Sequence, residues 1–253
     1  MSNRRIVLLV TAAIMLVAVP AAAAATLSNS GQTTVFQLWF ARSSQLWLTK
    51  RTVPATITPV RAALDTLLLG PTSAERAAGV STTIPAGTRV RSLSVAGDVA
   101  TLDVTATFGQ GTRMKLGQLA QTLGQFSTVK TVRLLESGKP LARFAVGDYW
   151  DLLPEIAVGT PGIGSTQLGA VAVTGNAEVF EGALQVRVLS STGAVLAKAP
   201  VSASCAAPCR GWYSAFVRFK VGQQQLGAVV VSSVAGGGVP ATKVRVPVVL
   251  APG

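Results

Sequence analysis

Residues 127–130, Ser-Thr-Val-Lys, form an S-x-x-K pattern, the spacing with which serine-lysine acyl enzymes of the cell wall place a nucleophile and its base. The companion S-D-N and K-T-G patterns are absent from the sequence. A lone four-residue match arises often by chance. This one also falls between an expected helix and an expected strand, whereas the chemistry would place it at the start of a helix. We interpret Ser127 and Lys130 as structural and keep a serine-lysine wall acyl enzyme as the least favoured hypothesis.

The absence of histidine removes most other catalytic sites. Ser-His-Asp and Cys-His catalysis cannot be built without it, nor can zinc sites that contain histidine. The ten acidic residues are spread thinly along the chain, so a carboxylate pair would need distant acids to meet in the fold, which the sequence leaves open. The glycine-containing stretch 159–169 lacks the lysine of a phosphate-binding loop. We therefore predict a protein that is not an enzyme, with no catalytic residue, no metal site and no cofactor.

The first 25 residues have the pattern of a secretory signal peptide. Arg4 and Arg5 precede an apolar run over residues 6–19, and an alanine string ends at Ala25. This order of charge, apolar run and small residues predicts cleavage near Ala25. An uncleaved membrane anchor is the alternative, while a lipid anchor is disfavoured because no cysteine lies at the cleavage site. We expect a secreted protein or one held in the extracytoplasmic envelope, at the cell wall or the outer face of the membrane.

Cys205 and Cys209 are the only cysteines of the chain. An exported chain meets oxidising conditions, which favours a disulfide between them. A redox or metal pair is the weaker alternative, because the spacing is not C-x-x-C and no histidine is available.

The chain is strongly basic, with a net charge of +12. Without the signal peptide, 20 basic residues stand against 10 acidic ones. In an exported protein this charge favours acidic wall polymers, anionic headgroups or an acidic protein as partner, and the export signal argues against nucleic acid. The basic residues are scattered singly, so a diffuse solubilising charge is an equal alternative to a specific basic site.

Strands and helices alternate through the first half of the mature chain. An apolar stripe at helical spacing between Pro59 and Gly70 predicts a helix capped by Thr58, and a second helix is expected over 115–126. The expected strands cover residues 35–40, 46–49, 90–95, 99–104 and 129–135. This mixture predicts a small α/β layer domain.

The second half has no helical periodicity. Its expected strands cover residues 170–174, 184–189, 194–199, 212–221, 226–232 and 242–250. Short strands with turn signals between them predict a β-sandwich. In the last strand Val244, Val246 and Val248 share one face, and Pro247 predicts a position at the edge of its sheet. The fold class is thus α+β, a small mixed α/β layer domain followed by an all-β sandwich.

Two stretches of the chain resemble known families. The segments VFQLWF, LDTLLLGP, STTIPAGTRVRSLSV and VATLDVTATF, with residues 119–141, resemble the GerMN domain, named after a bacterial sporulation and germination protein. The segment VTGNAEVFEGALQVRVLSSTGAVL at 173–196, with the aromatic strand near Trp212 and the VRVPVVL ending, resembles the immunoglobulin-like domain of bacterial spore-germination proteins. The resemblance implies a GerMN-like domain over 35–141 and an immunoglobulin-like sandwich over 155–251. It also implies an envelope role and offers no catalytic residue.

The four tryptophans are candidates either for the core or for contact with a partner. Strand positions favour the core for Trp39 and Trp212, whereas Trp47, on a possible edge hairpin, and Trp150, between the domains, are candidate partner contacts. The favoured hypothesis is a non-catalytic extracytoplasmic envelope protein that acts as a protein-binding or assembly module. Its alternative is a protein that binds a cell-wall polymer, an anionic glycan or peptidoglycan. A membrane is a partner only if the signal segment stays uncleaved.

Overall fold

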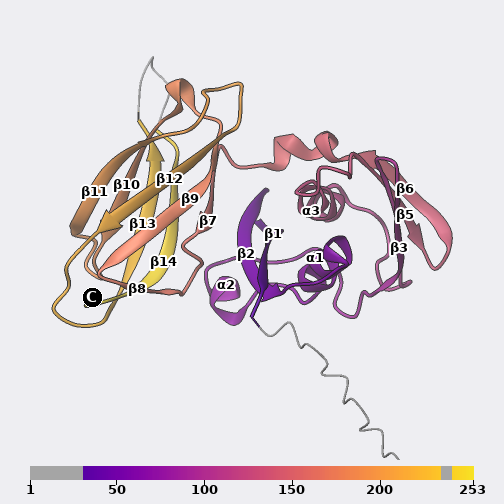
Figure 1. The fold of residues 1–253 in the computed structure, drawn as a ribbon, viewed down its shortest axis with the longest axis horizontal. Coiled ribbons are helices and arrows are strands. Elements are labelled where there is room, and N and C mark those ends of the chain that lie inside the picture. The colour runs from indigo at the N-terminus through magenta and orange to yellow at the C-terminus, as the bar shows by residue number, and fades with distance from the viewer. Residues whose placement is uncertain (1–30, 235–240) are drawn as a thin grey trace, which may run out of the picture. The chain divides into compact units, whose positions relative to one another are not determined.

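The first half of the described chain is built in three layers. In a computed structural model that describes residues 31–234 and 241–253, a two-stranded hairpin, a pair of helices and a four-stranded sheet follow one another (Figure 1). The elements are β1 (Thr33–Arg42), β2 (Gln45–Pro54), α1 (Pro59–Leu68), α2 (Ser73–Ala77), β3 (Val90–Ala96), β4 (Val99–Val104), α3 (Arg113–Leu123), β5 (Thr131–Glu136) and β6 (Lys139–Ala145). The predicted signal peptide lies outside the described residues.

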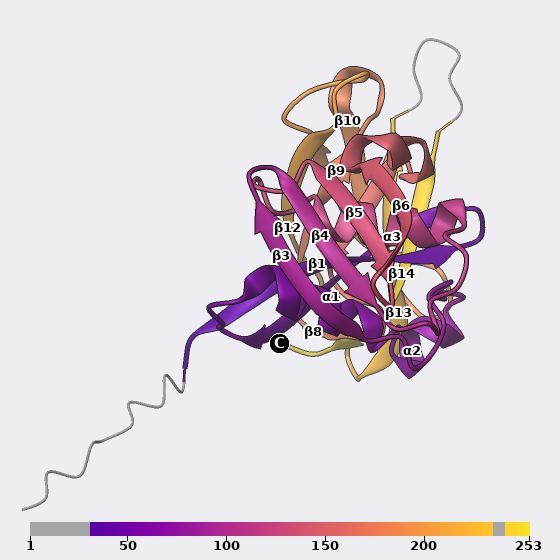
Figure 2. The same cartoon turned by 90° about the vertical axis from the view of Figure 1, so that its right-hand side faces the viewer.

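The four-stranded sheet covers one side of the helices with one face and leaves the other to solvent. Its order is β3-β4-β5-β6, with β4 and β5 parallel and joined through α3. Leu102, Val132 and Leu134 are buried toward the helices, whereas Arg133 and Arg143 lie on the solvent side. Figure 2 shows this sheet in front.

The hairpin β1–β2 is buried on both faces. Phe36, Leu38 and Phe40 face the helices and belong to the main core. Trp39, Leu46 and Leu48, on the opposite face, form a second cluster with Ala157 of β7 (Ile156–Thr160), the first strand of the second half. Lys50 Nζ donates to Thr174 Oγ1 at 3.1 Å on this same side. Burial lowers the pKa of Lys50.

The free edge of β1 is satisfied by side chains of α3 and of the turn that follows it, and by the backbone of one loop residue. Gln125 accepts from Gln37 N at 3.0 Å and donates to Gln37 O at 2.9 Å. Trp39 N donates to Thr122 Oγ1, and Gln118 Nε2 donates to Trp39 O. Two bonds between the backbones of Ala41 and Ser81 complete the edge. Buried backbone N–H and C=O groups need hydrogen-bond partners. Polar side chains and one loop backbone thus supply the partners that a neighbouring strand would otherwise provide.

The second half is a sandwich of two sheets (Figure 1). One sheet has the order β11-β10-β13-β14-β8 and the other the order β12-β9-β7. After the 3-10 helix η1 (Val146–Leu152) and β7, the elements are β8 (Thr166–Leu168), β9 (Ala170–Ala177), η2 (Phe180–Gly182), β10 (Ala183–Leu189), β11 (Val195–Ser202), β12 (Gly211–Arg218), β13 (Gln225–Ser233) and β14 (Lys243–Ala251). Valines and leucines that alternate along these strands fill the space between the sheets.

A glycine lets the smaller sheet carry a hydrogen bond across its middle strand. Tyr213 Oη donates to Ala157 O at 2.9 Å, from β12 to β7 over β9. The residue beneath it, Gly175, pairs with Tyr213 in the ladder. Burial raises the pKa of the Tyr213 hydroxyl, so it remains a donor across the physiological pH range.

The α+β fold class is confirmed, with corrections to several elements. The sequence interpretation missed α2, β6, β7 and β8. The prediction that β14 is an edge strand is wrong, because β8 pairs with residues 249–251. Pro247 precedes that ladder, where no N–H is needed. Thr58 precedes α1 as predicted but makes no side-chain capping bond. The domain boundaries stay a prediction, since residues Thr33–Gly253 pack as one compact unit.

No described helix has both the length and the apolar character needed to cross a membrane.

Candidate functional site

The outer face of β12 carries two exposed aromatic side chains. Residues along this strand alternate, so Tyr213 and Val217 point into the core while Trp212 and Phe216 point outward. Trp212 is 56% exposed and Phe216 is 64% exposed. Large apolar side chains that share one solvent-facing surface are typical of binding surfaces.

The same strand lies at the edge of its sheet. β12 pairs with β9 on one side, and no strand of the described chain pairs with its other side. Only the beginning of that free edge is occupied, where Ser204 N donates to Trp212 O at 2.8 Å and Trp212 N donates to Ser204 Oγ at 2.9 Å. The backbone beyond Trp212 is therefore open to another extended chain.

The disulfide supports the start of this strand. Cys205 and Cys209 are bonded in the turn between β11 and β12, with 5.8 Å between their Cα atoms, so the predicted disulfide is confirmed. Within the turn, Ala207 N donates to Val179 O at 3.0 Å. The cross-linked turn thus fixes Ser204 and, through it, Trp212.

A groove with a volume of about 660 Å³ lies beside Trp212. Its described lining includes the aromatic and polar side chains of Gln37, Trp39, Gln121, Gln125, Trp150, Asn176, Glu178, Arg210 and Trp212. Trp150 of η1 is 67% exposed, whereas Trp39 is buried. Flat aromatic rings and planar amides together can stack on and hydrogen-bond to a polar ligand.

Arg210 and Glu178 are the two charged residues among the described lining of the groove. Arg210 Nη1 donates to Asn176 Oδ1 at 3.0 Å, and its Nη2 lies 3.6 Å from Glu178 Oε2. Burial lowers the pKa of Arg210, an effect that the nearby Glu178 and Glu155 oppose. The guanidinium is thus held in place by neighbours rather than free in solvent.

The S-x-x-K residues are not arranged as a catalytic pair. Ser127 and Lys130 are both exposed in the segment between α3 and β5, and no hydrogen bond joins them. Val129 between them is buried in the main core. The pattern therefore coincides with a turn that packs an apolar residue. Across residues 31–234 and 241–253, no group of three or more histidine, cysteine or acidic side chains comes together to hold a metal.

The four tryptophans have different environments. Trp39 is in the core, as predicted. The same prediction for Trp212 is wrong, because the inward positions of β12 belong to Tyr213 and Val217. Of the two candidate contacts, Trp150 is exposed in the groove and Trp47 is buried against the core.

Phe216 was not among the predicted site residues. The sequence WYSAFVR contains a signal for it, because Ser214 and Arg218 mark the solvent face on which Trp212 and Phe216 also lie.

Two family models match the chain. The model described as sporulation and spore germination matches residues 37–142. The model described as the immunoglobulin-like domain of bacterial spore germination matches residues 155–238. A comparison with curated proteins finds no match.

Three solved structures are similar to parts of the chain. The first GerMN domain of the sporulation protein GerM from Bacillus subtilis is 20% identical with a TM-score of 0.34, covering 43% of this chain and 86% of that one. The tandem GerMN domains of the same protein are 16% identical with a TM-score of 0.39, covering 67% and 60%. A putative lipoprotein from Clostridium perfringens is 14% identical with a TM-score of 0.33, covering 48% and 93%.

All three TM-scores lie below 0.5, so family membership rests on the family models. Residues 37–142 belong to the sporulation and spore germination family, and residues 155–238 belong to the immunoglobulin-like domains of bacterial spore germination, as the resemblance in the sequence predicted.

Proposed function

We propose that this protein is a non-catalytic module of the extracytoplasmic envelope, related to sporulation and spore-germination proteins, that binds another protein through β12. One observation carries the proposal: Trp212 and Phe216 are each more than half exposed on one face of a strand whose outer edge, beyond Trp212, pairs with no other strand of the described chain. The export pattern at residues 1–25 and the disulfide support the compartment.

The physical argument combines the two properties of β12. An extended segment of a partner can add to the open edge through backbone hydrogen bonds, which supply affinity with little sequence demand. The two aromatic side chains then supply specificity, because each ring buries about 150–250 Å² when it is fully covered. Natural edge strands are normally protected by charge, proline or a covering loop. The centre of β12 instead presents Ser214 and Phe216.

The proposal of a non-catalytic role rests on the same geometry. Neither Ser127 nor Lys130 is among the residues that line the groove beside Trp212, and histidine is absent from the sequence. The two large exposed side chains of β12, Trp212 and Phe216, have no carboxylate or imidazole to transfer a proton, which suits binding rather than acid–base catalysis.

A photo-crosslinking phenylalanine analogue tests the surface in the producing bacterium. Placed at position 216, it is expected to form adducts that protease removes, because a protein lies against β12. The matched control is position 226, where Leu226 is 72% exposed on the other sheet of the sandwich. Mass analysis of both adducts measures the difference. Equal labelling at the two positions would contradict the proposal, as would an adduct that only a glycan-degrading muramidase removes.

The groove beside Trp212 favours a second candidate, binding of a cell-wall glycan. Exposed Trp150 and the amides around it provide the stacking surface and hydrogen-bonding groups that a sugar chain needs. Replacing Trp150 with alanine is then expected to weaken binding to purified peptidoglycan about tenfold, from the loss of about 1.5 kcal/mol of stacking. Sedimentation at low salt measures the bound fraction. Leu168→Ala, at a side chain that is also 67% exposed, is the control. Unchanged sedimentation of the Trp150→Ala variant would exclude this candidate.

A further inference from the structure

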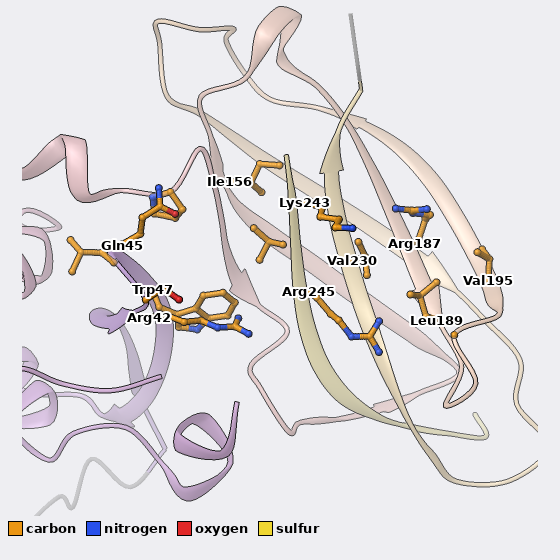
Figure 3. Close-up of a pocket in the computed structure, with 15 residues that line it drawn as sticks. Arg42, Gln45, Trp47, Ile156, Arg187, Leu189, Val195, Val230, Lys243 and Arg245 are labelled. Carbon is orange, nitrogen blue, oxygen red and sulfur yellow. The ribbon is translucent and has the colours of Figure 1, made fainter. Parts of the chain in front are cut away.

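A second cavity, apart from the aromatic surface, is lined by positive charge. Its volume is about 540 Å³, and it lies between the β1–β2 turn and the outer face of the five-stranded sheet. Its charged lining residues are Arg42, Arg187, Lys243 and Arg245, and no acidic residue is among the lining. Figure 3 shows Arg42 on one side and the other three cations on the opposite side.

The register of the sheet places these cations on one face. Arg187 of β10 pairs with Val230 of β13, and Val230 pairs with Arg245 of β14. The Cα atoms of the two arginines are therefore two strand spacings apart, roughly 10 Å. Lys243 occupies the same face of β14 two residues earlier, and Lys198 continues the row beyond Arg187. Neighbouring like charges on one sheet face destabilise each other unless an anion lies between them.

None of the four lining cations has an acidic partner in the part of the chain that the structure describes. The five ion pairs there belong to Arg51, Arg61, Arg91, Arg113 and Arg210. Arg187 Nε is also buried and has no hydrogen-bond acceptor. A buried donor without an acceptor costs about 1–3 kcal/mol, which an oxygen of a bound ligand would offset.

An aromatic ring holds the Arg42 side chain in place on its side of the cavity. The Arg42 guanidinium lies 4.4 Å from the centre of the Trp47 ring, which supports it through a cation–π interaction. Trp47 is itself buried against the core. This cation is therefore oriented before a ligand arrives, which lowers the entropy cost of binding.

We propose that this cavity is a binding site for a phosphate-type oxyanion. Guanidinium groups match the oxygens of a phosphate in a paired geometry, and a lysine adds a point charge. The volume accommodates a phosphate together with part of the molecule that carries it. The site contains none of the residues of the β12 surface, so a test of this site is independent of a test of the proposed function.

Titration of the purified protein with inorganic tripolyphosphate, at fixed ionic strength in a calorimeter, tests the site. The Arg187→Gln/Arg245→Gln variant is expected to bind at least tenfold more weakly than the unaltered protein. The matched control is Arg133→Gln/Arg143→Gln, which removes the same charge from a cross-strand arginine pair on the β5–β6 face, far along the chain from the cavity. Its affinity is expected to stay within twofold.

Thermal melting separates loss of the site from loss of the fold. Tripolyphosphate is expected to raise the Tm of the unaltered protein and of the control, because a ligand that binds only the folded state stabilises it. At the same ligand concentration it is expected to raise the Tm of the Arg187→Gln/Arg245→Gln variant by less, because the weaker affinity gives a smaller stabilisation. Should that variant fail to fold, Lys243→Gln/Arg245→Gln replaces it, since both side chains are exposed. No saturable binding to the unaltered protein, or an equal loss in both double variants, would overturn the proposal.

The source of the phosphate is distinguished by three further probes. Inorganic phosphate, a soluble poly(glycerol phosphate) chain and vesicles of phosphatidylglycerol carry the same oxyanion on a small ion, a polymer and a lipid. Whichever probe binds the unaltered protein most tightly, and loses at least tenfold with Arg187→Gln/Arg245→Gln, identifies the carrier. Loss with the control variant as well would assign the binding to diffuse charge and overturn the site.

Discussion

Replacing Gly175 with alanine is expected to lower the free energy of unfolding by about 3 kcal/mol, as for overpacking at a site that cannot relax. A Cβ atom at this position would collide with the carbonyl oxygen of Ala157 and would lie 2.5 Å from Tyr213 Oη. Neither group can retreat easily. Ala157 belongs to β7, which pairs with β9, and the Tyr213 hydroxyl is bonded to that same carbonyl.

Urea denaturation followed by far-UV circular dichroism measures this loss. Gly222→Ala is the control, because a Cβ at Gly222 meets no atom within 4 Å. It is expected to change the free energy of unfolding by less than about 0.5 kcal/mol. If the Gly175→Ala protein unfolded at the same urea concentration as the control, the hydrogen bond from Tyr213 of β12 to Ala157 of β7 would not pass over Gly175 as described.

Replacing Gln118 with methionine is expected to lower the free energy of unfolding by about 2 kcal/mol, because it leaves the buried carbonyl of Trp39 without a partner at a cost of about 1–3 kcal/mol. It also removes the acceptor of the Thr83 N–H. Gln118 is fully buried. Its Nε2 donates to Trp39 O at 3.2 Å, and its Oε1 accepts from Thr83 N at 2.9 Å. Methionine keeps a similar volume, so the loss reports the hydrogen bonds rather than a cavity.

Thermal unfolding of the Gln118→Met variant, compared with Gln223→Met, measures the effect. Gln223 is exposed in the segment before β13, so its replacement is expected to leave the Tm almost unchanged. Equal melting of the two variants would mean that the free edge of β1 does not depend on α3.

Local patterns in the sequence predicted the elements whose signals lie within the element itself. The valines of β14 alternate as expected. Leu116, Leu119, Ala120 and Leu123 of α3 are buried as expected, although the polar residues between them are buried as well. α2 was missed although Thr72 and Glu75 form a capping box, a signal that the sequence contains. β7 and β8 are short strands that exist only through their partners β9 and β14, and no local pattern specifies such pairing.

The candidate sites depend still more on distant pairing. The basic residues are scattered along the chain, yet Arg187 and Arg245 share one face of the sheet because both pair in register with Val230 of β13. In the same way, the buried Gln118 of α3 and Gln125 of the turn after it look unfavourable until the edge of β1 is placed beside them. Helical periodicity predicts where Gln118 lies, but it does not predict the backbone groups of β1 to which the two side chains bond.

The packing of the hairpin β1–β2 affects whether one half of the chain can be exchanged for that of a relative. Its outer face packs Trp39, Leu46 and Leu48 against Ala157, so the seam between the two matched families is an apolar surface rather than a flexible tether. Recombination that exchanged either half for that of a distant relative would expose a tryptophan and two leucines to water unless the incoming half brought a complementary β7. The packing at this surface therefore disfavours the exchange of one half alone, even though each half matches a family model of its own.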